Sequence, residues 1–272
     1  MQPDFLSVEA LADRVPDGAT LAVPRDDSGC AMTVVRHLLR RPVRGLHLLG
    51  VPTVGFQGDI LIGGGCVSTL EVAALTLGEH GPAPRFSAAL ASDAIAMRDS
   101  TCPAIHAGLQ AAEKGIPFIP LRGLLGTDLL AHRDDWLVID NPMAGGGDPI
   151  VLLPAIAPEV ALFHAPRADR HGNVWVGVRR ELMLLAHAAR TTLVSVERIE
   201  DTDLLADDLT AAGTIPALYV TALAEAPNGA WPLGLPGTSP TDHAALREYV
   251  RMARTRAGFE QWLQESVAGE PA

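Results

Sequence analysis

The sequence has little of what marks nucleic-acid-binding, secreted or membrane proteins. Its 272 residues include 21 lysines and arginines against 32 acids, a formal net charge of −11. Such a surface repels phosphate backbones, so no nucleic acid is expected as a partner. Apolar runs stay short of the roughly 20 residues that span a bilayer. The opening "MQPDFLSVEALADRV" carries acids where a signal peptide carries lysine or arginine. These absences predict a cytoplasmic protein that has no contact with a membrane.

Cysteine is scarce as well. Cys30, Cys66 and Cys102 lie far apart and form no Cys-x-x-Cys pair. This spacing fits neither a zinc site nor a disulfide framework and is typical of a reducing compartment. The chain also lacks a dinucleotide fingerprint. We therefore expect no metal and no permanently bound cofactor.

Aromatic residues make up only 4% of the chain, although 48% of it is hydrophobic. The core is therefore expected to consist of leucine, valine, alanine and isoleucine, as in parallel α/β layers. Short apolar strands are predicted at 20–24, 45–54 and 58–65, with helices at 31–41 and 69–81. This alternation predicts an α/β fold with an open, mostly parallel sheet and helices on both faces.

The second half continues the alternation and then changes character. Strands are predicted at 116–123, 135–142, 160–166, 173–177 and 191–199, and a helix at 181–191. Residues 226–242 are rich in proline and glycine, which predicts an irregular surface segment. The residues that follow are helical and more charged. We expect one α/β domain over 1–225, with residues 226–272 packing on it as an irregular segment and a helical C-terminal tail.

The stretch "FHAPRADRHGNVWVG" (163–177) gathers Asp169, Arg170, His171 and Asn173 between two apolar runs. Aspartate and asparagine bond to their own main chain in turns, and glycine supplies positive φ. No nucleophile lies nearby in sequence, as an Asp-His pair in nucleophilic catalysis would need. The pattern favours a turn between two strands over a catalytic cluster.

The same region carries a resemblance. Residues 154–177, "PAIAPEVALFHAPRADRHGNVWVG", resemble a segment of the α-type subunits of family I CoA transferases, and the branch that contains the A subunit of glutaconate CoA-transferase is most similar. "VPDGATLAV" (15–23), residues 106–130 and "TTLVSVERI" (191–199) resemble further segments in the same order. The resemblance implies a fold of the CoA-transferase and sugar-isomerase type.

The resemblance to α-type CoA-transferase subunits also implies that the active site is divided between two chains. In the family's transferase mechanism, the acyl-CoA thioester is attacked by a glutamate of the β-type subunit, which forms a glutamyl-CoA thioester. The α-type chain forms one wall of the site. The resemblance therefore implies a β-type partner subunit, coenzyme A as part of the substrate, and a main catalytic residue on the partner.

The loop after the first strand departs from the family pattern. Many relatives have a glycine pair followed by proline where this chain has "VPRDDSGCAMTVV" (23–35). Ser28, Gly29 and Cys30 begin a predicted helix, where backbone N–H groups can approach an anion. Two acids beside them repel an anion unless Arg25 compensates. Arg25, Ser28, Gly29 and Cys30 are therefore candidates for substrate or CoA binding. The alternative is that Asp27 or Ser28 only caps the helix.

Further candidates are Gly63, Gly64 and Gly65, which can hold a thioester or pantetheine against bare backbone or form only a strand-end turn. Glu71 is either a catalytic base or a first-turn acid of the predicted helix. His106 is expected in a core or an interface, and Cys66 as a small buried thiol. Ser100, Thr101 and Cys102 stand near the point where steroid-ring hydrolase relatives have an acid, so that role is not expected here.

Three functions are compatible with these features. The first is the α-type subunit of a CoA transferase that acts on short dicarboxylic acyl-CoA thioesters. The second is a subunit of a C–C lyase on the same scaffold, such as a methylglutaconyl-CoA-type decarboxylase. The third, a ligand sensor, ranks last because such sensors usually carry a basic DNA-binding segment.

Overall fold

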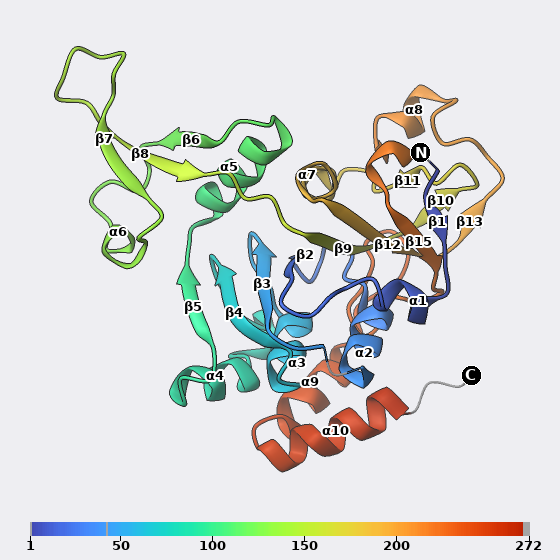
Figure 1. Cartoon of the computed structure of the whole chain (residues 1–272). Helices are drawn as coiled ribbons and strands as arrows, with labels where there is room; N and C mark the ends of the chain where they lie inside the picture. Colours follow the sequence, from blue (N-terminus) through green and yellow to red (C-terminus); the bar gives the residue numbers. More distant parts are fainter. Residues whose placement is uncertain (1, 42, 269–272) are drawn as a thin grey trace.

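An eight-stranded sheet forms the centre of the molecule (Figure 1). The computed structural model describes residues 2–41 and 43–268. Every neighbouring pair in this sheet is parallel. In spatial order the strands are β1 (Asp4–Phe5), β15 (Ala222–Glu225), β12 (Thr191–Val196), β9 (Val160–Ala165), β2 (Thr20–Pro24), β3 (Leu46–Val51), β4 (Val67–Val72) and β5 (Ala96–Asp99).

Helices cover both faces of this sheet, as the sequence predicts (Figure 1). On one face lie α1 (Val8–Ala12), α2 (Met32–Arg40), α3 (Phe56–Gly63), α4 (Pro84–Ala91), α9 (His243–Met252) and α10 (Arg256–Ala268). On the other lie α5 (Cys102–Glu113) and α7 (Arg180–Ala188). The expected open α/β sheet is confirmed.

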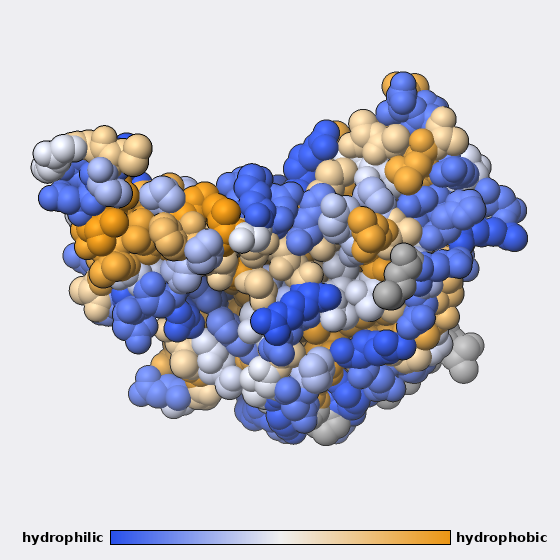
Figure 2. Space-filling model, turned by 45° about the horizontal axis from the view of Figure 1, so that its top comes forward, coloured by the Kyte–Doolittle hydropathy of each residue, from blue (hydrophilic) through white to orange (hydrophobic). Residues whose placement is uncertain are grey.

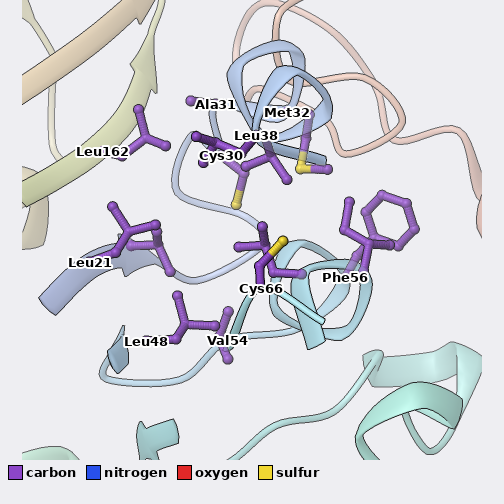
Figure 3. Packing of buried hydrophobic residues seen from close by; sticks show 14 of the residues in the cluster. Leu21, Cys30, Ala31, Met32, Leu38, Leu48, Val54, Phe56, Cys66 and Leu162 are labelled. Atoms are coloured by element: carbon purple, nitrogen blue, oxygen red, sulfur yellow. The ribbon is translucent and has the colours of Figure 1, made fainter. Parts of the chain in front are cut away.

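Each face has its own apolar core, because successive side chains of a strand point to opposite sides. In β3, Leu48 belongs to the cluster under α2 and α3, and the next residue, Leu49, belongs to the cluster under α5 and α7. Figure 3 shows part of the first cluster, to which Leu21 of β2, Leu48 of β3 and Phe56 of α3 all belong. Strands buried on both faces explain the continuous apolar runs in the sequence.

Two predicted elements are wrong. Residues 56–63, expected to be largely strand, form helix α3, and 67–72, expected to be mostly helix, form strand β4. All eight residues of α3 are buried. A helix buried on every side has no amphipathic period, so its sequence resembles that of a buried strand. The residues of the predicted helix beyond β4 form only a short 3-10 helix, η1 (Gly78–His80).

Two smaller sheets extend from the central one. An arm contains the antiparallel strands β6 (Phe118–Leu121), β8 (Pro149–Pro154) and β7 (Leu137–Asp140), with the short helix α6 (Leu129–His132). The second small sheet contains β13 (Ile199–Glu200), β10 (Arg167–Asp169), β11 (Val174–Trp175) and β14 (Thr214–Ile215). Near it lie α8 (Asp208–Ala211) and the 3-10 helix η2 (Ala217–Tyr219).

The turn predicted at 163–177 is confirmed. β10 and β11 are antiparallel, and Gly172 between them has φ 87°. The Asp169 carboxylate accepts hydrogen bonds from the backbone N–H groups of His171 and Asn173, each at 2.9 Å, and from the Asn173 side chain at 2.8 Å. Burial favours a higher pKa for Asp169, but these bonds outweigh it and lower the pKa. His171 is exposed at the tip.

The C-terminal helices pack on α3. Tyr249 of α9 and Trp262 of α10 both make edge contacts with the Phe56 ring, at centroid distances of 4.8 and 5.9 Å. The Tyr249 hydroxyl donates a hydrogen bond of 2.5 Å to Oδ2 of the buried Asp59. Asp59 also accepts from the backbone of Phe86, at the start of α4. One buried carboxylate thus joins α3, α4 and α9.

In the described part of the chain, every helix is too short or too polar to cross a membrane.

We expect the substitution Tyr249→Phe to lower the free energy of unfolding by about 1–3 kcal/mol, because Asp59 then loses a buried hydrogen-bond donor. Urea denaturation measures the change. Tyr219→Phe, at a partly exposed tyrosine, serves as the control and should change stability by less than about 0.5 kcal/mol. Equal losses in the two variants would contradict the role assigned to Tyr249.

Candidate substrate site

A cavity of about 400 Å³ opens beside the loops that follow β2, β3 and β4. In a parallel sheet these loops meet at one edge, where ligands of open α/β folds bind. The C-terminal segment closes the cavity from the opposite side. The lining residues are Arg25, Asp26, Asp27, Thr53, Val54, Gly55, Thr76, Leu77, Gly78, Glu79, His80, Leu233, Thr241, His243 and Leu246.

The loop after β2 is held against β9 by a close backbone contact. Gly29 has φ 98°, and a Cβ at this position would lie 2.1 Å from the carbonyl oxygen of His164. The His164 N–H donates a 2.7 Å hydrogen bond to the Gly29 carbonyl oxygen. Only glycine combines this φ with this approach. The loop therefore has a fixed position where the strand order reverses, between β2 and β9.

Asp26 lines the cavity. Its Oδ2 accepts a 2.8 Å hydrogen bond from the backbone N–H of Phe56, at the first residue of α3. A Cβ on Gly55 would lie 2.2 Å from the same oxygen, so a glycine is needed here for the carboxylate to reach the helix. Among the described residues, Oδ1 of Asp26 has no hydrogen-bond partner.

Burial raises the pKa of Asp26 to about 7, although backbone N–H groups of Phe56 and Gly55 favour its charged form. A carboxyl group with this pKa exchanges its proton near neutral pH, as a general acid or base does. A strongly shifted group in a cavity is also a common feature of functional sites. Asp26 is therefore the candidate acid–base group of the cavity.

Arg25 lies at the same cavity but is exposed. Its Nε lies 2.5 Å from Oδ1 of Asp27, and the two side chains are 52% and 61% exposed. A surface pair of this kind contributes little, about 0–1 kcal/mol, so a ligand carboxylate can compete for the guanidinium.

Other candidates from the same loop lie away from the cavity. The buried Ser28 hydroxyl donates to Glu181 of α7. Cys30 is buried near Gln57, and burial raises the pKa of its thiol well above the usual range. Glu181 and His106 line a second hollow of about 430 Å³ on the other face of the sheet. The structure thus places Arg25 at the cavity and Ser28 between the cavity and the second hollow.

The glycines 63–65 lie at the opposite edge of the sheet. Gly63 ends α3, Gly64 is its C-cap, and Gly65 has φ 71° in the turn that leads to the start of β4. A Cβ on Gly63 would lie 2.6 Å from the ring of Phe259. Gly63 therefore allows α3 to pack closely against α10, and a Cβ on Gly64 would lie 2.4 Å from the Leu39 side chain of α2, so these two glycines serve packing apart from the cavity.

Glu71 is not a first-turn helix acid as predicted, because it lies in strand β4. Its buried carboxylate accepts a 2.9 Å hydrogen bond from Arg133 and lies 3.1 Å from the His47 ring. Burial favours a higher pKa, but His47 and Arg133 together lower the pKa of Glu71. Arg133 also pairs with Asp135, which precedes β7, so this cluster fastens the arm to the central sheet.

Cys66 is buried as expected, and burial raises the pKa of its thiol to about 11. The sequence does not single out Asp26, whose raised pKa depends on packing against α3. Nor does it indicate Thr241, His243 or Leu246, which come from the far end of the chain. The only signal in the sequence is the charged loop that follows the strand at 20–24, now β2.

Comparison with known families gives a match over residues 7–226 to the Coenzyme A transferase model. The chain belongs to the coenzyme A transferase family. The family and the CoA-transferase type of enzyme expected from the sequence are thereby confirmed.

Among similar proteins, an uncharacterized protein of Archaeoglobus fulgidus is 30% identical over 96% of this chain, which spans only 58% of that longer protein. The A subunit of 3-oxoadipate CoA-transferase from Pseudomonas knackmussii is 28% identical, and the match covers 96% of this chain and 92% of that protein.

Two solved structures are similar throughout. A variant of the decarboxylase AibA/AibB has a TM-score of 0.86 and 28% identity, and the match covers 98% of this chain and 100% of the other. Glutaconate coenzyme A-transferase from Acidaminococcus fermentans has a TM-score of 0.88 and 24% identity, with 97% and 88% covered. The expected CoA-transferase fold is confirmed.

We expect Asp26→Asn to change how stability depends on pH. Because the folded-state pKa is raised, folded Asp26 keeps a proton that the unfolded chain releases above about pH 4. Its contribution to stability therefore falls as the pH rises from about 4 to about 7. An asparagine side chain does not titrate, so the drop in unfolding free energy between about pH 5 and 8 should shrink by about 1–3 kcal/mol.

Urea denaturation at the two pH values measures this change, and Asp134→Asn, at an exposed aspartate, is the control. If Asp26→Asn and Asp134→Asn show the same pH dependence as the unchanged chain, Asp26 has an ordinary pKa.

Proposed function

We propose that this chain is the α-type subunit of a two-subunit enzyme that transfers coenzyme A between short dicarboxylic acids. The observation that carries the proposal is the cavity at the carboxyl ends of β2, β3 and β4 in a chain of this family. Relatives named as A subunits of 3-oxoadipate and glutaconate CoA-transferases support it. The substrate is a coenzyme A thioester, and coenzyme A is part of that substrate rather than a resident cofactor.

The size of the cavity suits the acyl group. Pockets for small molecules range from about 300 to 1,000 Å³, and this one has about 400 Å³. A short acyl chain fits within it, and the long coenzyme extends outside toward the partner subunit.

Arg25 is the only arginine or lysine in the cavity wall, as far as the structure describes the chain. Its ligand is the distal carboxylate of a dicarboxylic acyl group, which displaces the exposed Asp27 from the guanidinium. A charge-assisted contact of this kind contributes about 1.5–3 kcal/mol. With the acyl group held by Arg25, the thioester carbon faces outward, open to attack from the partner.

A second candidate function is a C–C lyase, and two observations favour it. The decarboxylase AibA/AibB matches this chain at 28% identity, and Asp26 has a pKa of about 7 at the cavity wall. When a carboxylate leaves as CO₂, the electron pair of the broken C–C bond stays on the acyl carbon. That carbon then takes a proton, which Asp26 can donate.

The partner is proposed to bind the arm. Phe118, Leu137 and Leu152 lie on one side of its sheet, since Pro120 pairs with Leu152 and Leu152 pairs with Leu137. Phe118 is 49% and Leu137 59% exposed. Figure 2 shows apolar side chains gathered on the arm, beside a hollow that separates it from the lobe with α8. Exposed apolar patches often mark protein–protein interfaces.

Co-expression with a β-type subunit should give a complex that neither chain forms alone, and Phe118→Asp should weaken it at least about tenfold. Leu209→Asp, at an 87% exposed leucine on α8, should leave it unchanged. Size-exclusion chromatography and light scattering measure assembly.

The reaction of the purified complex distinguishes the two candidate functions. Transfer of coenzyme A to an acceptor acid supports the first function. Release of CO₂ without an acceptor supports the second. A chain that is fully active as a monomer contradicts both.

Arg25→Ala in the complex should reduce kcat/KM for a dicarboxylyl-CoA by roughly 10–100-fold and spare the monocarboxylyl analogue, because only the former has a second carboxylate. Arg14→Ala is the matched control, since Arg14 forms a similarly exposed pair with Asp4 at 2.9 Å. Equal losses with both substrates, or unchanged rates, would remove Arg25 from the acyl site.

A further inference from the structure

We propose that Glu79, His80 and His243 form a binding site for a divalent transition-metal ion of the Zn²⁺ type at the rim of the cavity. The sequence indicates no cluster of metal ligands, because His243 lies 163 residues after His80. Folding brings the three together: η1 supplies Glu79 and His80, and the first residue of α9 supplies His243. One possible ligand atom from each lies within 4.8 Å of the other two.

The distances suit tetrahedral coordination. Nε2 of His80 lies 3.1 Å from Nδ1 of His243, which lies 3.0 Å from Oε1 of Glu79. The third separation, between His80 Nε2 and Glu79 Oε1, is 3.8 Å. Ligands about 2.0–2.1 Å from a tetrahedral zinc ion are about 3.3 Å apart. The three observed separations lie on both sides of this value, so one ion fits between the three atoms with small side-chain shifts.

Hydrogen bonding alone accounts poorly for this arrangement. Nδ1 of His243 is nearly equidistant from the imidazole nitrogen and the carboxylate oxygen, yet a ring nitrogen carries at most one hydrogen. That hydrogen can lie on only one of the two contacts. In a metal site, neutral imidazoles and a carboxylate direct their lone pairs at the ion, and all three atoms are satisfied together.

The donor set selects the kind of ion. Two imidazole nitrogens and one carboxylate oxygen suit Zn²⁺ and similar ions, whereas Mg²⁺ and Ca²⁺ prefer oxygen ligands. The His80 side chain is only 7% exposed, while those of Glu79 and His243 are 71% and 51% exposed, which leaves an entry path from solvent.

Local backbone structure keeps the ligands in place. Gly78 and Gly81, with φ 58° and 94°, bracket Glu79 and His80 in η1. The Asp242 carboxylate caps α9 by accepting from the Ala245 N–H at 2.9 Å, which fixes the helix end that carries His243. An ion bound here joins the loop after β4 to the C-terminal segment.

All three ligands belong to the cavity wall. Three protein ligands leave a fourth tetrahedral position for water or another oxygen. The site itself rests on this ligand geometry and does not depend on the proposed reaction.

The test is isothermal titration of the chelator-treated, dialysed full chain with ZnCl₂. We expect one Zn²⁺ per chain, little competition from a large excess of Mg²⁺, and, with Co²⁺, the strong visible absorption of a tetrahedral site. Zn²⁺ should also raise the melting temperature by mass action. His80→Ala, Glu79→Gln and His243→Ala should each weaken binding at least about tenfold.

His187→Ala is the matched control, because His187 forms a 3.0 Å contact with Glu113 but belongs to no such three-ligand cluster in the described chain. Circular dichroism checks that each variant is folded. Zn²⁺ binding that is lost in the three cluster variants and kept in His187→Ala supports the site. Absence of binding, or equal binding in His243→Ala and the unchanged chain, overturns it and leaves the cluster a hydrogen-bonded contact. Neither result depends on CoA transfer.

Discussion

The rest of the site depends on the close backbone contact between Gly29 and His164. It fixes the loop after β2 at the point where the strand order reverses, and a side chain at position 29 would prevent it. With the loop held there, Asp26 reaches the start of α3, where a second glycine, Gly55, gives it room. Burial at this position raises the pKa of Asp26 to about 7. The site therefore requires glycine at positions 29 and 55, where a side chain would prevent these close approaches.

The same histidine fastens the C-terminal segment. The buried His164 ring makes hydrogen bonds of 2.8 Å with Ser195 and 2.9 Å with Glu197. Glu197 in turn accepts from the backbone of Asn228, and Gly229 lies against the ring. A serine, histidine and acid in a row resemble a catalytic triad, but Ser195 is fully buried. The network instead holds the proline- and glycine-rich segment over the sheet edge, where it completes the cavity.

The ion pairs of Arg25, at the cavity, and of Arg133, below the arm, differ in exposure. Arg25 is held only by an exposed pair with Asp27, whereas Arg133 is nearly inaccessible between Glu71 and Asp135. Solvent screens the attraction between Arg25 and Asp27, so a ligand carboxylate can readily replace Asp27. Pulling Arg133 away from Glu71 would instead leave buried charges without partners. The chain thus places its structural ion pairs under the arm and its exchangeable arginine at the proposed acyl site. The apolar side of the arm, with Phe118 and Leu137, is exposed in this chain.

The amino-acid sequence was enough to predict the class of fold, the family and the turn at Asp169, because these depend on local periodicity, on turn chemistry and on segments similar in order to known relatives. It also placed Arg25 in a charged loop after the strand at 20–24, which is β2. The sequence did not identify α3 as a helix, since burial on every side removes the period that distinguishes helix from strand. The domain boundary at residue 225 stays a prediction. Only the folded chain shows that Asp26 has a raised pKa, that the three consecutive glycines lie at the far edge, and that His243 meets Glu79 and His80. Each of these depends on contacts between residues distant in the chain, and no local pattern records such contacts.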